Sequence, residues 1–82
     1  MGFPEEIKRA RQKCFLTQND FAKAINVAFS TVNRWEGGKA KPNLSAMRSI
    51  KEFCIENDIE YSTLEEAWLD FTVEAKETEN CL

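Results

Sequence analysis

The sequence predicts an all-α fold in which five short helices pack around one core. Five segments carry apolar residues three or four positions apart, which is the spacing that gives a helix one buried face. No segment shows the strict apolar–polar alternation that is typical of a strand. A length of 82 residues, with three Gly and two Pro, fits one small domain and excludes two.

The first helix is expected at about residues 4–14. Pro4 suits its first position, where a missing backbone N–H costs nothing, and Glu5 and Glu6 complement the positive end of the helix dipole. Its apolar positions, Ile7, Ala10 and Cys14, follow at helical spacing.

The second and third helices are expected at about residues 18–25 and 29–36. Thr17 is typical of an N-cap with Asp20 as its partner, and Asn26 readily takes the left-handed conformation that ends a helix. The third helix has two inward apolar residues and a polar outer face, and Gly37-Gly38 ends it. The inward pair is Val32 and Trp35, and the outward set is Ser30, Thr31, Asn33 and Arg34.

The fourth and fifth helices are expected at about residues 44–57 and 63–72. Asn43 caps the fourth, and Ser62 to Glu65 offers a capping box for the fifth. The apolar faces are Leu44, Met47, Ile50, Phe53 and Cys54 in the fourth, and Leu64, Ala67, Trp68 and Phe71 in the fifth. We therefore expect one domain over residues 1–72 and a frayed acidic tail over 73–82.

Charge is distributed unevenly along the chain. The net charge is −3, but residues 1–51 carry +6 and residues 52–82 carry −9. This asymmetry favours contact of the first part with a polyanion, while the acidic part stays in solvent or faces a protein partner.

Several classes of function are disfavoured by the composition. The chain has no His, which removes the usual catalytic triads and most catalytic metal sites, and Cys14, Cys54 and Cys81 lack the spacing of a zinc site or a disulfide framework. We therefore expect no enzymatic activity, no metal and no cofactor. The absence of a long apolar run and of a signal-peptide layout predicts a cytoplasmic protein without a membrane segment.

The second and third helices, with the short turn between them, have the pattern of a helix-turn-helix. Ala22 is small where the third helix crosses above it, Asn26 tolerates positive φ, and Val32 is a compact apolar plug between the helices. A generic helical hairpin carrying these residues by chance is the alternative.

These residues lie within a longer pattern, over about residues 7–53, that resembles the phage-repressor and Cro type of helix-turn-helix DNA-binding family, also called xenobiotic-response-element-like. Three departures stand out: Asn26 where the family most often has Gly, Ala28 where a hydroxyl N-cap is usual, and Gly37 where Asn is frequent. Ala28 costs the third helix about 1 kcal/mol relative to Ser. The matching residues are Arg11, Leu16-Thr17-Gln18, Phe21-Ala22, Ile25-Asn26-Val27, Ser30 to Glu36, Gly37-Gly38-Lys39 and Lys41-Pro42.

The resemblance implies a lambda-repressor-like domain that binds a near-palindromic double-stranded DNA operator as a homodimer, with the third helix in the major groove. Arg34 can donate two hydrogen bonds to guanine, and Phe29 can pack against a thymine methyl group. The expected base contacts are Phe29, Ser30, Thr31, Asn33 and Arg34, and the expected phosphate contacts are Thr17, Gln18, Lys39 and Lys41. In the alternative, Phe29 folds back on its own helix, and Asn33 and Arg34 are ordinary surface residues.

Arg11 and Glu36 both fall on helix faces that the apolar pattern would bury. The resemblance implies a structural ion pair between them, which links the first helix to the end of the third. Removing one partner of such a pair strands the other charge and costs about 3 to 5 kcal/mol.

The expected function is that of a small transcriptional regulator, either a repressor or an autoregulator, controlled by dimerisation, concentration or a protein partner. The apolar residues in and around the fifth helix either form the dimer or partner surface or only complete the core; they are Ile59, Tyr61, Leu64, Trp68, Leu69 and Phe71. The alternative function is a protein-interaction module, or an antitoxin-type partner-binding protein, on the same fold.

Overall fold

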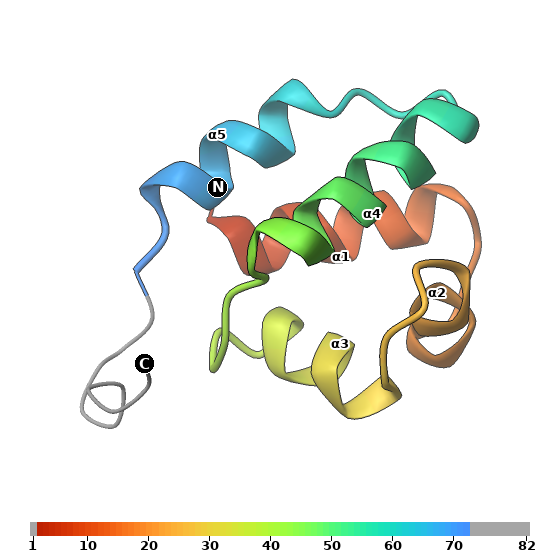
Figure 1. Cartoon of the computed structure of the whole chain (residues 1–82), viewed down its shortest axis with the longest axis horizontal. Coiled ribbons are helices and arrows are strands. Elements are labelled where there is room, and N and C mark those ends of the chain that lie inside the picture. The colour runs from red at the N-terminus through yellow and green to blue at the C-terminus, as the bar shows by residue number, and fades with distance from the viewer. Residues whose placement is uncertain (1, 73–82) are drawn as a thin grey trace.

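The computed structural model describes residues 2–72 and places five helices in them (Figure 1). They are α1 (Phe3–Lys13), α2 (Gln18–Ala24), α3 (Phe29–Glu36), α4 (Leu44–Glu56) and α5 (Ser62–Asp70). The predicted all-α architecture of five helices is confirmed, with ends that differ from the expected ones by at most two residues. The predicted tail over 73–82, with Cys81, lies outside the described residues.

Two of the three predicted helix caps are present. The Thr17 hydroxyl accepts a 3.0 Å hydrogen bond from the Asp20 backbone N–H in a full capping box, and Asn43 Oδ1 accepts one of 2.9 Å from the Ala46 N–H. The capping box predicted for α5 is wrong. Tyr61 already has helical backbone angles, so Ser62 lies inside the first turn and its hydroxyl donates to Glu60 instead.

Two residues after the end of each of the helices α1 to α4 lies a residue in the left-handed backbone conformation. These residues are Phe15, Asn26, Gly38 and Asp58, with φ of 59°, 63°, 76° and 58°. In each case the following residue donates a backbone hydrogen bond to the carbonyl five positions earlier, as Val27 does to Ala22 at 2.9 Å. The positive φ predicted for Asn26 is thereby confirmed.

The core collects apolar side chains from all five helices. Phe21 of α2 meets Phe53 of α4 edge to face, with ring centroids 5.1 Å apart. Leu44, expected in the core, is 65% exposed because it lies at the first position of α4, before the buried stripe begins. The buried set is Phe3, Ile7, Ala10, Phe21, Ala22, Ile25, Val32, Trp35, Met47, Ile50, Phe53, Cys54 and Leu64.

Helix α1 is the element that joins the two sides of the molecule. It packs against α3 and also against α5, while α2 packs against α3 (Figure 1). Helix α5 contacts the loop between α3 and α4 through Trp68, whose Nε1 donates a 2.8 Å hydrogen bond to the Pro42 carbonyl. This arrangement leaves the outer face of α3 uncovered by the other described elements.

Candidate functional site

The contact between α2 and α3 is built on small and compact side chains. Ala22 is 1% exposed and Val32 is fully buried, as the helix-turn-helix pattern predicts. The turn between the helices covers residues 25–28, which is one residue longer than expected because α2 ends at Ala24. Ala28 has extended backbone angles at the start of α3 and supplies no side-chain cap.

The outer face of α3 carries most of the residues predicted to contact bases. Ser30, Asn33 and Arg34 are exposed, Thr31 is half-buried, and Phe29 is 49% exposed at the first position. The structure brings these five side chains together on one short helix. That surface can donate and accept hydrogen bonds and carries positive charge at Arg34.

The only acidic residue of α3 is turned away from that face. Glu36 accepts from Arg11 of α1 twice, with Nε to Oε2 at 2.7 Å and Nη2 to Oε1 at 2.9 Å. The third Arg11 contact runs from Nη1 to the Leu16 carbonyl at 2.8 Å. The hydrogen bonds to Glu36 raise the pKa of the Arg11 guanidinium above its usual value, so Arg11 keeps its positive charge.

This ion pair extends outward to the predicted site through two amide side chains. Gln18 Nε2 donates to Glu36 Oε1 at 3.0 Å, and Asn33 Nδ2 donates to Gln18 Oε1 at 3.1 Å. We call the four residues Arg11, Glu36, Gln18 and Asn33 the polar chain. The family resemblance implies the Arg11–Glu36 pair, which the structure contains, but the links from Glu36 to Gln18 and from Gln18 to Asn33 have no signal in the sequence.

The residues predicted to contact phosphates are in different situations. Thr17 is exposed immediately before α2, and Lys39 is exposed in the loop after α3. Gln18 is half-buried in the polar chain. Lys41 is turned inward: its Nζ donates to the Phe71 carbonyl at 2.9 Å and lies 4.8 Å from the centre of the Trp68 ring. Its charge is therefore held between the loop after α3 and the end of α5.

A second feature near α3 was not predicted. A hollow of about 630 Å³ separates the turn before α3 from the start of α4, and Thr31, Lys41, Asn43, Ser45 and Ser49 are among the residues that line it. Ser45 and Ser49 lie one helical turn apart on α4, and this spacing of hydroxyls is the signal that could have pointed to this surface.

The apolar residues around α5 divide into two groups. Leu64 is 2% exposed, and Ile59, Tyr61, Trp68 and Phe71 are partly buried against the core. Leu69 alone is largely exposed, at 63%. Most of this group therefore completes the core of the single chain.

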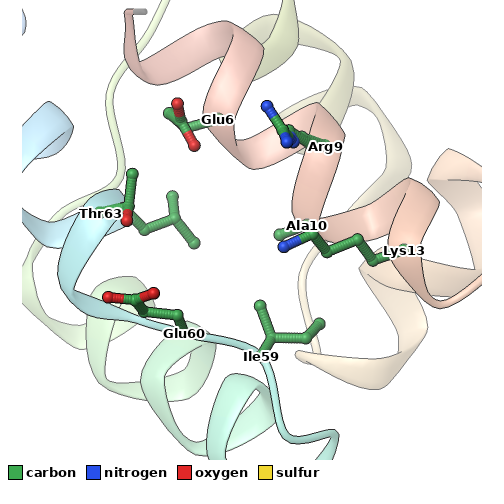
Figure 2. A pocket seen from close by; sticks show the side chains of 8 residues that line it. Glu6, Arg9, Ala10, Lys13, Ile59, Glu60 and Thr63 are labelled. Carbon is green, nitrogen blue, oxygen red and sulfur yellow. The ribbon is translucent and has the colours of Figure 1, made fainter.

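On the α1–α5 side lies a smaller hollow of about 240 Å³ (Figure 2). Figure 2 shows Arg9 and Lys13 on α1 across from Ile59 and Glu60.

Within residues 2–72, no helix is long and apolar enough to cross a membrane. The same residues hold no group of three or more His, Cys, Asp or Glu side chains that could bind a metal ion.

Comparison with known proteins gives two matches that overlap this region. A family model described as helix-turn-helix matches residues 7–54. The HTH-type transcriptional activator BcrR of Enterococcus faecalis is 32% identical over 53 residues, which cover 65% of this chain. The matched part is 26% of BcrR, so the chain spans about a quarter of the length of that relative. No solved structure matches the chain.

Proposed function

The chain belongs to the Cro/C1-type helix-turn-helix family, and on this basis we propose that it regulates transcription by sequence-specific binding to double-stranded DNA. In the proposed complex α3 lies in the major groove and α2 bridges to the sugar-phosphate backbone. This family is one of DNA-binding regulators rather than enzymes.

The observation that carries this proposal is the uncovered face of α3. Its side chains are polar or aromatic, Arg34 supplies a positive charge, and the one carboxylate of the helix is bound to Arg11. A face of this kind can enter the negative field of DNA without electrostatic cost, which an acidic recognition surface could not do. The net charge of −3 does not oppose binding, because the acidic residues are concentrated after residue 51.

Base readout is assigned to α3. Arg34 donates two hydrogen bonds to the O6 and N7 atoms of a guanine, which is worth about 1 to 3 kcal/mol of discrimination. Ser30 and Thr31 bond to base edges or adjacent phosphates, and the exposed part of Phe29 packs against a thymine methyl group. Asn33 also contacts a base.

Backbone contacts are assigned to the N-terminal end of α2 and to the segment after α3. Thr17 and Lys39 lie exposed there and bind phosphates, as does Gln18 through the first turn of α2. Lys41 joins them only if its ammonium group leaves Phe71 and Trp68. These contacts supply affinity that falls with salt concentration, and they do not select sequence.

We also propose a homodimer on a near-palindromic operator, with the exposed Leu69 of α5 at or near the contact between subunits. The same surface is the candidate site for a regulatory protein partner. The proposed output is repression or autoregulation, since an occupied operator blocks access of other proteins to the same DNA. BcrR is named as an activator, so the sign of a reporter response decides this point.

Selection of binding sites from a random duplex library, followed by fluorescence anisotropy at two salt concentrations, tests the proposal. Affinity should fall steeply with salt, and Arg34→Ala should weaken binding to the selected site by about 5- to 150-fold. The matched control is Arg9→Ala, because Arg9 is exposed on the α1–α5 side and should leave binding unchanged. A wild-type protein that binds no duplex even at low salt would instead support a protein-interaction module.

A further inference from the structure

We propose that Gln18 and Asn33 act as one specificity-determining pair, in which Gln18 fixes the amide of Asn33 so that it reads an adenine in the major groove. The inference rests on the proposed DNA binding and adds to it the base class that Asn33 recognises. It also changes the main role of Gln18, from a phosphate contact to a positioning residue.

The direction of the hydrogen bonds starts at Glu36. An ionised carboxylate only accepts hydrogen bonds, and Glu36 already accepts two from Arg11. The neighbouring Gln18 amide lies 3.0 Å from Glu36 Oε1, so it must present its NH₂ group there. The opposite orientation would place two oxygen atoms, one of them charged, in contact without a proton between them.

The same logic fixes Asn33. With the Gln18 NH₂ directed at Glu36, Gln18 Oε1 is the atom that faces Asn33, and it accepts from Asn33 Nδ2 at 3.1 Å. This bond uses one of the two Asn33 N–H groups. Asn33 is left with one N–H and its carbonyl oxygen Oδ1 free for a ligand on the exposed face of α3.

One donor and one acceptor in fixed order match only part of the major-groove code. Adenine presents the complementary pair, the N6 amino donor and the N7 acceptor. Guanine presents two acceptors, so its O6 would face the Asn33 carbonyl oxygen, and cytosine offers a donor alone. Asn33 therefore favours adenine, and it sits next to Arg34, which favours guanine.

The inner end of the polar chain is what makes the orientation rigid. The Arg11 and Glu36 side chains are 12% and 5% exposed, so water competes poorly for their hydrogen bonds. A Gln18 side chain anchored on such a pair cannot rotate freely, so its Oε1 offers the exposed Asn33 amide an acceptor in a fixed position. The cost of arranging the Asn33 amide is thus met before DNA arrives.

The test compares wild type, Gln18→Leu, Asn33→Ala and the double variant by site selection and by affinity for single-base variants of the selected site. Asn33→Ala should reduce the adenine preference at one position of each half-site by about 5- to 150-fold. Gln18→Leu should reduce it at the same position, and the double variant should lose no more than the larger single effect. Gln12→Ala is the matched control, since Gln12 is an exposed glutamine on α1.

A second measurement needs no DNA. In NMR spectra of the free protein, the Asn33 side-chain amide protons should show a contact to the Gln18 amide, and Gln18→Leu should abolish their protection from exchange. Thermal unfolding confirms that each variant is folded. The exposed Asn33→Ala change keeps the test valid if Gln18→Leu unfolds.

Three results would overturn the inference. One is a uniform loss of affinity in Gln18→Leu with a shallower salt dependence and an unchanged base preference, which marks a phosphate contact alone. Another is a guanine at the position that Asn33→Ala affects, or no affected position at all. The third, absence of wild-type binding to every duplex, would overturn the proposed function together with this inference, whereas the first two leave DNA binding intact.

Discussion

Replacing Arg11 by Ala should cost this fold a large share of its free energy of unfolding. The change removes three hydrogen bonds, two to Glu36 and one to the Leu16 carbonyl. It leaves the Glu36 carboxylate, 5% exposed, with Gln18 as its remaining side-chain partner. A nearly buried charge that has lost its counter-ion is the source of the cost.

The magnitude follows from these contacts. Breaking a buried pair by removing one partner costs about 3 to 5 kcal/mol. A domain of this size has about 4 to 10 kcal/mol of stability in total, so Arg11→Ala should remove about a third of it or more. For a domain of 60 to 100 residues, each kcal/mol corresponds to about 4 to 8 °C, which predicts a fall in Tm of at least about 12 °C.

Urea denaturation followed by circular dichroism measures this loss, with two comparisons. Arg9→Ala removes the same charge from an exposed position two residues earlier on α1 and should change stability by less than about 0.5 kcal/mol. The double variant Arg11→Met/Glu36→Leu removes both charges and should recover most of the loss. A single variant within about 1 kcal/mol of wild type, or a double variant no more stable than the single, would refute the stranded-charge argument.

Three further predictions concern single positions. Ala28→Ser should add the missing N-cap of α3 and stabilise the fold by about 1 kcal/mol in urea denaturation; no gain would mean that the first turn of α3 is already satisfied. Phe15→Gly should raise stability by about 1 kcal/mol, because Phe15 has φ of 59° and is 94% exposed, and a loss would show that the ring packs in solution. Burial raises the pKa of the Cys54 thiol to about 11, so Cys54 should react with a thiol reagent at pH 8 only when the protein unfolds. In a Cys81→Ser background, the partly exposed Cys14 should react in the folded protein and serves as the comparison. Since the Cys54 thiol ionises earlier in the unfolded chain, stability should also fall as the pH rises from about 9 to 11, and Cys54→Ala should flatten that dependence.

The helix starts and the register of the helix-turn-helix were predictable because they depend on neighbours in sequence. Thr17 with Asp20 and Asn43 with Ala46 form caps three residues apart, and the spacing of Phe21, Ala22 and Ile25 sets the buried face of α2. The capping box at Ser62 failed because the backbone of Tyr61 had already become helical. The left-handed turn at Phe15 had no sequence signal, since an aromatic residue has no preference for that conformation.

The candidate site was predictable as a set of residues but not as an arrangement. The sequence placed Asn33 and Arg34 on the outer face of α3, and the structure leaves both exposed. It could not show that Asn33 is bonded to Gln18, or that Lys41 faces Trp68 rather than solvent. The hydrogen bond of Asn33 and the position of Lys41 both depend on side chains from other helices, which approach only in the folded protein.

The amino-acid order alone determined that this chain forms short helices and that α2 and α3 cross on Ala22 and Val32, because periodicity, capping and side-chain size act over a few residues. Tertiary packing alone decided where the long polar side chains point. Gln18 and Glu36 are 18 positions apart, and Lys41 and Phe71 are 30 apart, so their hydrogen bonds form only after the helices have packed. A flexible polar side chain bonds to whichever partner the packed helices bring within reach, and the residues next to it in sequence do not indicate that partner.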